Sequence, residues 1–403
     1  MSSEFIVAGY FSALLLAIVV SVWLLLRREN APNNVFYLVF GALTLRVIYV
    51  IVDHNLGLFA GDPDGDFPLY HRILRHVAAG WHEGNLLAPF ELASVLGVTQ
   101  LYRTTYGFVF GPVYFVFGYQ PVLVRLTMAL IGTLVVFNIY RIGRQVFDHH
   151  AGLYAGGFAA GYPYFVQLSG VFYRDMLILL ALTQLVYLLI SWMETRDNRT
   201  FVLAVVVAVV ALSLRVHNII PIGAAFAVAV YCHFEGNRFR VPAVAASALA
   251  TFLVLVTVFR DYMSIQALAG RREWLLQGNA QYLPGVVYAT PVEYLQFLPL
   301  GMAYFLLVPF PWHTHNLLAV VSIGMNVLFW YPIIVLSIFG VRRLWQHSRP
   351  IAYFLLTFVA GGLLIYGSVE GNIGPAMRHR TQFQFIFFVL AGHVLAERVR
   401  VRY

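Results

Sequence analysis

The sequence predicts an all-α, polytopic integral membrane protein that forms a single transmembrane domain over residues 1–403. Hydrophobic residues make up 60% of the chain and charged residues only 11%, whereas an ordinary soluble domain carries about 25% charged residues. Folded in water, such a chain would expose large apolar patches. The composition therefore excludes a soluble enzyme, a disordered protein and a nucleic-acid-binding protein.

Eleven apolar stretches predict about eleven transmembrane helices, because a spanning helix needs about 20 apolar residues. The predicted spans are 5–26, 35–52, 121–140, 151–168, 175–193, 200–214, 217–233, 241–259, 316–340, 351–368 and 382–397. Two further apolar stretches, 106–118 and 295–310, are interrupted by Gly and Pro. We interpret them as juxtamembrane or re-entrant segments.

The basic residues indicate how the spans are oriented. With eleven spans, the short basic segments all fall on one side of the membrane, at residues 27–28, 141–144, 196–199, 238–240, 342–349 and 398–402. Because cytoplasmic loops are enriched in Lys and Arg, we expect an external N-terminus and a cytoplasmic C-terminus in the plasma membrane. The two long connections, 53–120 and 260–315, are then external loops, and we expect juxtamembrane helices in them.

All 26 basic residues are Arg, and Cys232 is the only cysteine. A single cysteine excludes an internal disulfide and a cysteine-based zinc site. A GC-rich genome explains the absence of Lys, although guanidinium groups also bind phosphate bidentately. Arg46 and Arg125 lie within apolar stretches, and snorkelling to the interface explains Arg125 because it lies near the end of its span.

Three carboxylates follow the second predicted span, at Asp62, Asp64 and Asp66. An EF-hand calcium loop is excluded, because Ile73 stands where that loop needs a bidentate Glu. Two interpretations stay open: a solvated, turn-rich loop, or a general base or metal-binding carboxylate at the membrane surface. Residues 70–79 have apolar residues at helical spacing, which predicts an amphipathic helix on the outer interface or an ordinary loop helix.

Asp175 stands at the outer mouth of a predicted span, directly after Tyr173 and Arg174. A charge at the bilayer centre costs about 2.5–3.5 kcal/mol on insertion scales, and much less at a helix end. The three residues are therefore either an interfacial Arg–Asp pair or part of a site in which Asp175 faces the same cavity as Asp66.

Arg378, His379 and Arg380 open the last predicted span from the outside. The helix dipole disfavours cations at a helix N-terminus, so this group makes sense beside an anion such as a phosphate. The phosphate of a lipid headgroup would interact with these arginines in the same way, so lipid headgroup binding stays open as an alternative. Arg215 and His217, at the start of another span, are weaker candidates for the same pocket.

Other polar residues are weaker candidates for a functional site. We expect Arg271, Arg272 and Glu273 at the protein surface, and we expect His313 and His315 at the membrane interface, because two His alone make a poor metal site. The sequence contains no phosphate-cradling Gly-rich loop, no Gly-x-Ser-x-Gly motif and no His-Glu-x-x-His motif. These absences argue against a nucleotide-driven pump and a soluble-type hydrolase.

A set of short motifs resembles a known superfamily. The motifs are Gly65-Asp66 with Tyr70-His71, Val124-Arg125-Leu126, the run from Tyr140 to Phe147, Gly161-Tyr162-Pro163, and Asp175. Together they are similar to GT-C glycosyltransferases, in particular to the branch of protein O-mannosyltransferases and aminoarabinose lipid A transferases. The resemblance runs over roughly 35–200, with 298–312 and 370–397.

The resemblance implies a GT-C-like fold and a polyprenyl-phosphate sugar donor, such as a dolichol phosphate. In that family a carboxylate of the first external loop acts as base or metal ligand, and Asp66 matches it best, followed by Asp64. Asp175 matches the acidic residue of the second external loop. A divalent metal, Mg or Mn, would bind Asp66 and Asp175. The residues expected to bind the donor phosphate are Arg378, Arg380, His379 and Arg215.

The sequence therefore predicts a membrane glycosyltransferase that inverts the sugar and acts on an acceptor hydroxyl at the external face. Such a transfer needs a base for the hydroxyl and a cation for the leaving phosphate. The acceptor is a protein, a lipid or a glycan, and no nucleic acid is expected as a partner. The alternative is a transporter or flippase of a phosphorylated lipid, although the sequence lacks the internal repeat of many transporters.

Overall fold

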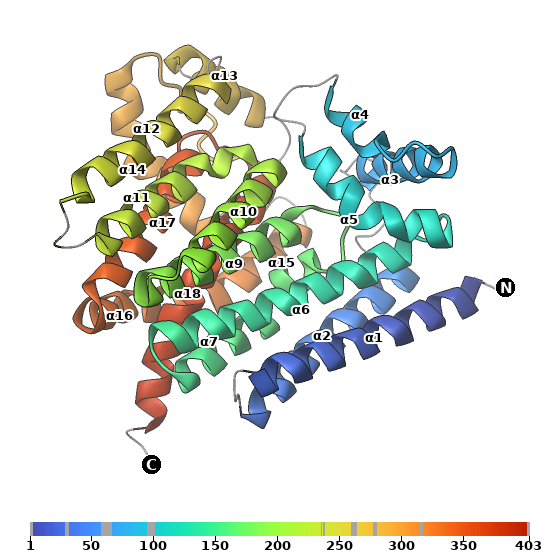
Figure 1. The fold of residues 1–403 in the computed structure, drawn as a ribbon. Helices are drawn as coiled ribbons and strands as arrows, with labels where there is room; N and C mark the ends of the chain where they lie inside the picture. The colour runs from blue at the N-terminus through green and yellow to red at the C-terminus, as the bar shows by residue number, and fades with distance from the viewer. Residues whose placement is uncertain are drawn as a thin grey trace.

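The structure of the protein, a computed structural model, consists mainly of α-helices (Figure 1). Within the described ranges, the only β-type pairing is an isolated bridge between Gln281 and Asn372. The all-α prediction is therefore confirmed. The described residues are 3–28, 32–57, 67–94, 101–234, 236, 238–258, 264–276, 280–314 and 317–400.

Each predicted span coincides with helical structure. By length and composition alone, seven of the described helices are long and apolar enough to cross a membrane. The chain is thus a multi-pass membrane protein, and the total of eleven spans stays a prediction. The helices at the predicted spans are α1 (Ser3–Arg28), α2 (Asn33–Leu56), α6 (Pro121–Val146), α7 (His149–Gly161) with α8 (Pro163–Leu168), α9 (Asp175–Thr195), α10 (Asn198–Leu214), α11 (Ile219–His233), α12 (Arg240–Val258), α15 (Leu317–Met325) with η4 (Asn326–Trp330) and α16 (Tyr331–His347), α17 (Arg349–Gly367) and α18 (Ile373–Arg400).

The predicted span over 151–168 consists of two helices, α7 and α8, and not of one continuous helix. Tyr162 adopts an extended conformation between α7 and α8, and Pro163 begins α8. Proline has no N–H for the helical ladder and clashes with the preceding turn. The last carbonyls of α7 therefore need donors from elsewhere in the protein.

Arg46 supplies those donors from α2. Its side chain is fully buried, and its terminal nitrogens donate to the carbonyl oxygens of Ala159 at 3.1 Å and Ala160 at 3.4 Å. Its Nε donates to Ser169 Oγ at 3.1 Å, just beyond α8. An arginine inside an apolar segment is thus explained by the helix break that it satisfies.

Arg125 does not snorkel, contrary to the interpretation of the sequence. The side chain is 2% exposed and forms a buried ion pair with Asp53 near the end of α2. Its Nε donates to the carbonyl oxygen of Gly170, in the connection between α8 and α9. The isolated sequence of one span could not show this, because Asp53 lies 72 residues away.

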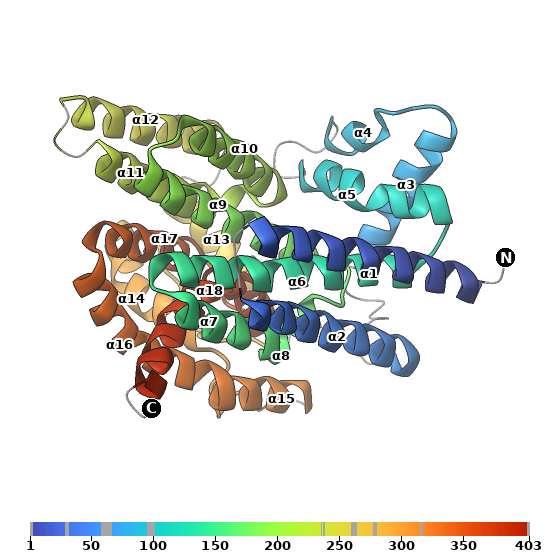
Figure 2. The same cartoon turned by 60° about the horizontal axis from the view of Figure 1, so that its bottom comes forward.

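The two long connections carry helices of their own. The first contains α3 (Phe67–His82), α4 (Ala88–Ser94) and α5 (Leu101–Phe117), and the second contains α13 (Ile265–Leu275) and α14 (Pro291–Leu307). Figures 1 and 2 show α3, α4 and α5 together at the end of the bundle where α6 begins. The amphipathic helix predicted over 70–79 is α3, which buries its apolar face and exposes Arg72 and Arg75.

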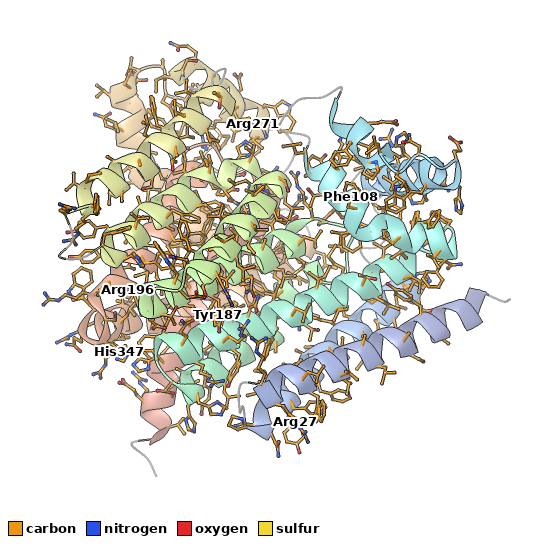
Figure 3. The ribbon with its side chains drawn as sticks, viewed as in Figure 1. Arg27, Phe108, Tyr187, Arg196, Arg271 and His347 are labelled. Atoms are coloured by element: carbon orange, nitrogen blue, oxygen red, sulfur yellow. The ribbon has the colours of Figure 1, made fainter. Side chains whose placement is uncertain are left out.

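Residues from the short basic segments lie together at one end of the bundle. Arg27, Arg196 and His347 lie at one end, whereas Phe108 and Arg271 lie at the other (Figure 3). Arg27, Arg28 and Arg144 also stand in the last turns of their helices, where the helix dipole favours cations. This distribution is the one on which the predicted orientation rests.

Close packing of α7 against α18 depends on glycine. A Cβ atom on Gly392 of α18 would lie 2.7 Å from Ala155 N and 2.8 Å from Ala151 O on α7. Backbone atoms cannot yield as a flexible side chain can. Small residues at such positions allow membrane helices to approach closely.

We predict that Gly392→Val destabilises the protein by about 1–3 kcal/mol, the usual cost of overpacking. The matched control is Gly157→Val on α7, where an added Cβ meets nothing within 4 Å. Thermal unfolding of the detergent-solubilised variants measures the difference. Equal unfolding temperatures for the two variants would contradict this account of the contact.

Candidate functional site

Asp175, the first residue of α9, is fully buried and lies between two guanidinium groups. Arg215 donates from its terminal nitrogen to Asp175 Oδ1 at 3.1 Å. Arg378 Nε lies 3.3 Å from Oδ2, an ion pair without hydrogen-bond geometry. One carboxylate thus joins the start of α9, the end of α10 and the second turn of α18.

Local sequence explains why these groups meet. Asp175 opens α9, where the helix dipole stabilises an acid. Arg215 ends α10, and the short helix η2 (Val216–Asn218) follows before α11 begins. Arg378 lies near the N-terminal end of α18, which is unfavourable for a cation unless an anion is near. Asp175 supplies that anion.

Arg174, Asp175, Arg215 and Arg378 form what we call the Asp175 cluster. Arg174 stacks over the ring of Tyr102 at 3.7 Å, and Arg378 lies over the ring of Tyr173 at 4.4 Å. Arg215 is 4% exposed, whereas 22% of the Arg378 side chain is exposed. The cluster therefore holds three cations against one acid, with Arg378 more open to solvent than Arg215.

A second acid, Glu370, lies beside the cluster in the turn between α17 and α18. It is buried and contacts His379 Nδ1 through its Oε1. Burial raises the pKa of Glu370 to about 7, although Arg215, Arg271 and Arg378 act in the opposite direction. The His379 side chain is 18% exposed, so it lies between the buried acid and the solvent.

The second long connection holds the Glu370 turn in place. Arg272 donates to the carbonyl oxygens of Glu370, Leu283 and Val286, the last two at 3.0 and 3.2 Å. Arg272 is 1% exposed, so its predicted surface position is wrong. Its neighbours Arg271 and Glu273 are half-buried and exposed, respectively. The sequence could not show the difference, because the carbonyls that Arg272 satisfies come from two separate segments.

Arg380 lies apart from the Asp175 cluster. Its terminal nitrogens donate to the carbonyl oxygens of Leu306 and Val308 at 2.8 and 2.7 Å, and to Asn326 Oδ1 at 2.9 Å. Asn326 in turn donates to the carbonyl oxygens of Leu307 and Pro309. Arg380 thus supports the end of α14, and its terminal nitrogens are already engaged there.

Asp64 and Asp66 lie outside the described residues, so the structure does not place them. The adjoining residue does have a defined position: Phe67 packs edge-on against Phe172, with ring centroids 4.7 Å apart. Phe172 lies three residues before Asp175, and its carbonyl oxygen accepts a hydrogen bond of 2.9 Å from Tyr106 on α5. The first long connection is therefore docked beside the chain segment that carries Asp175.

The described residues do not suit a divalent metal at this site. They contain no group of three His, Cys, Asp or Glu side chains that could hold one. Both oxygens of Asp175 face guanidinium groups, and the surrounding positive charge opposes a second cation. His313 is buried, and its Nδ1 accepts a hydrogen bond of 3.2 Å from Phe310 N, whereas His315 lies outside the described residues.

Sequence reasoning missed Glu370 as a site residue and treated Arg174 only as a partner for Asp175. The signal for Glu370 was available, because an acid stands nine residues before His379 in a short turn between two predicted spans. The burial of Glu370 could not be predicted from the sequence, because it depends on Arg272 and the second long connection.

Comparison with known proteins gives one family. Residues 106–260 match the model of the dolichyl-phosphate-mannose-protein mannosyltransferase family, whereas no curated protein matches the chain. The matched segment contains Asp175 and Arg215, and Arg378 lies beyond it. The match confirms the resemblance seen in the sequence, and it supports a membrane glycosyltransferase that uses a polyprenyl-phosphate sugar donor.

Glu370 makes the stability of the fold depend on pH. The folded protein retains the Glu370 proton up to about pH 7, because burial raises its pKa, whereas the unfolded chain releases it near pH 4.5. The stabilising contribution of proton binding is therefore lost as the pH rises from about 4.5 to 7.

We predict that Glu370→Gln becomes more stable relative to the wild type as the pH rises from about 5 to 8, because its amide does not titrate. Thermal unfolding in detergent over this pH range measures the difference. Glu273→Gln, which removes an exposed acid, serves as the control and should show no such trend. A constant offset between the Glu370 variant and the wild type would contradict the prediction.

Proposed function

We propose that the protein transfers a sugar from a polyprenyl-phosphate donor to an acceptor hydroxyl at the end of the bundle that carries the Asp175 cluster. The observation that supports this proposal is the excess of guanidinium groups around one buried acid, with Arg378 partly exposed. Positive charge held by a rigid scaffold in a partly dry site stabilises a leaving phosphate strongly.

In this proposal Arg378 binds the donor phosphate, with His379 and Arg215 beside it. Arg215 and Asp175 hold Arg378 in position, so the guanidinium needs little reorganisation when the phosphate arrives. Arg380 would act through the fold, because its terminal nitrogens are taken by Leu306, Val308 and Asn326. Of the four residues that the sequence predicts to bind the phosphate, the proposal therefore keeps three and excludes Arg380.

Asp66 is the proposed base, with Asp64 as the second choice. It would take the proton of the acceptor hydroxyl while the hydroxyl oxygen attacks the anomeric carbon from the side opposite the phosphate. The bond from that carbon to the phosphate oxygen then breaks, and the phosphate leaves with the electron pair. The contact between Phe67 and Phe172 supports this role, because it docks the loop beside the Asp175 segment.

Further features of the proposal come from the family and the charge pattern. The family name indicates a protein as acceptor and mannose as sugar. The basic residues favour an external N-terminus, a cytoplasmic C-terminus and an external active site in the plasma membrane. A Mg or Mn ion would have to bind through Asp66 and its neighbours, because Asp175 is already paired with Arg215 and Arg378. Sugar transfer measured before and after EDTA treatment tests for such a metal ion.

We predict that Asp66→Asn lowers sugar transfer by about 10²–10⁴-fold, the usual contribution of a general base, while donor binding is retained. Transfer from a radiolabelled polyprenyl-phosphate sugar in membranes measures the effect. Asp62→Asn removes a carboxylate from the same acidic segment and is the matched control. Full activity of Asp66→Asn would disprove the base assignment, whereas donor binding without transfer in the wild type would favour a lipid carrier or flippase.

We predict that Arg378→Gln weakens donor binding by about tenfold or more, because one charge-assisted hydrogen bond contributes about 1.5–3 kcal/mol. Arg72→Gln, which removes an exposed arginine from α3, should bind the donor normally. Equilibrium binding of the donor to purified protein measures both variants. Unchanged affinity in Arg378→Gln would remove this residue from the phosphate site.

A further inference from the structure

The structure contains a cavity with two arginines in its lining, away from the Asp175 cluster. It has a volume of about 330 Å³ and is lined by Arg141, Arg144, Gln145 and Tyr187, from α6 and α9. Tyr187 follows Asp175 by twelve residues along α9, which corresponds to about 18 Å at 1.5 Å per residue. In Figure 3 Tyr187 lies toward the end of the bundle that carries Arg196 and His347. The glycosyl transfer proposed above makes no use of this cavity.

The lining of the cavity combines two guanidinium groups with an aromatic support. Arg141 stacks over the ring of Tyr187 at 3.7 Å and also lies over Phe137 at 5.7 Å. Such stacking orients the planar guanidinium at the cavity wall. Arg144 stands one helical turn further along α6, on the same face. Two guanidinium groups at this spacing suit the oxygens of a phosphate group.

Gln145 adds an acceptor to this lining. Its Nε2 donates to Ser191 Oγ at 3.0 Å and to Glu194 Oε2 at 2.8 Å. Among the described residues its Oε1 is buried and has no hydrogen-bond partner. A buried acceptor of this kind is costly unless a donor reaches it. A hydroxyl group carried next to a phosphate would satisfy it.

We propose that this cavity binds a phosphate group, with Arg141 and Arg144 as its ligands and Gln145 accepting a hydrogen bond from a neighbouring hydroxyl. The volume is near the lower end of the range for small-molecule pockets, about 300–1,000 Å³, so it suits a headgroup and not an entire lipid. The phosphate belongs either to an anionic phospholipid of the adjoining leaflet or to a soluble phosphate. This inference stands independently of the proposed glycosyl transfer.

The test uses the full-length protein, delipidated in detergent, as wild type and as the double variant Arg141→Gln/Arg144→Gln. The probes are phosphatidylglycerol, diacylglycerol, which lacks the phosphate, and inorganic phosphate. Native mass spectrometry measures lipid binding, and thermal unfolding measures protection by inorganic phosphate. The control variant Arg199→Gln/Arg342→Gln removes two exposed arginines, so it has the same loss of charge.

We expect the wild type and the control to bind the first phosphatidylglycerol at least tenfold more tightly than the double variant does, because each guanidinium contributes a charge-assisted hydrogen bond. Diacylglycerol should not distinguish the proteins. Protection by inorganic phosphate, lost in the double variant while lipid binding is equal in all proteins, would assign the site to a soluble phosphate. Equal responses of the double variant and the control to every probe would overturn the proposal.

The double variant also removes the stacking of Arg141 on Tyr187, so it could fail to fold. Arg144→Gln alone leaves that stack intact and keeps the test decisive. It should weaken the binding of phosphatidylglycerol, or the protection by inorganic phosphate, by roughly tenfold relative to Arg342→Gln alone. Equal binding by these two single variants would likewise overturn the proposal.

Discussion

The contact of Asp175 with Arg215 and Arg378 is the constraint on which the functional end of the protein depends. It joins α9, α10 and α18, and it places a cation near the start of α18, where the helix dipole alone would disfavour it. Removing one partner of a buried ion pair costs about 3–5 kcal/mol, since the remaining charge is left uncompensated. Phe172, three residues before Asp175, contacts Phe67 and so joins the first long connection to the same point.

A common rule explains three other buried arginines. Arg46 satisfies carbonyls at the break between α7 and α8, Arg272 satisfies the Glu370 turn, and Arg380 satisfies the end of α14. Each guanidinium donates to backbone carbonyl oxygens at a helix end, a helix break or a turn. Buried carbonyl oxygens without a donor are costly in an apolar environment. By contrast, Arg215 and Arg378 share one carboxylate, Asp175, whereas the buried Arg125 has the carboxylate of Asp53 as its partner.

Much of this architecture could be predicted from the sequence, because apolar length and helical spacing are local properties. Each predicted span coincides with helical structure, and the amphipathic helix predicted over 70–79 appears as α3. The pairing of Arg125 with Asp53, the burial of Arg272 and the separation of Arg380 from Arg378 could not be predicted. They depend on which distant segments meet, and neighbouring residues on one helix can face different partners. The break at Pro163 could have been predicted, because proline interrupts a helical ladder.

The most direct measurement is the structure of the protein with a polyprenyl-phosphate sugar bound. The account predicts that the donor phosphate oxygens lie within hydrogen-bonding distance of the Arg378 guanidinium, with Arg215 still paired to Asp175. The sugar should then lie on the side of Phe67 and Asp66. A donor phosphate bound elsewhere, with the Asp175 cluster unchanged and unoccupied, would contradict the account.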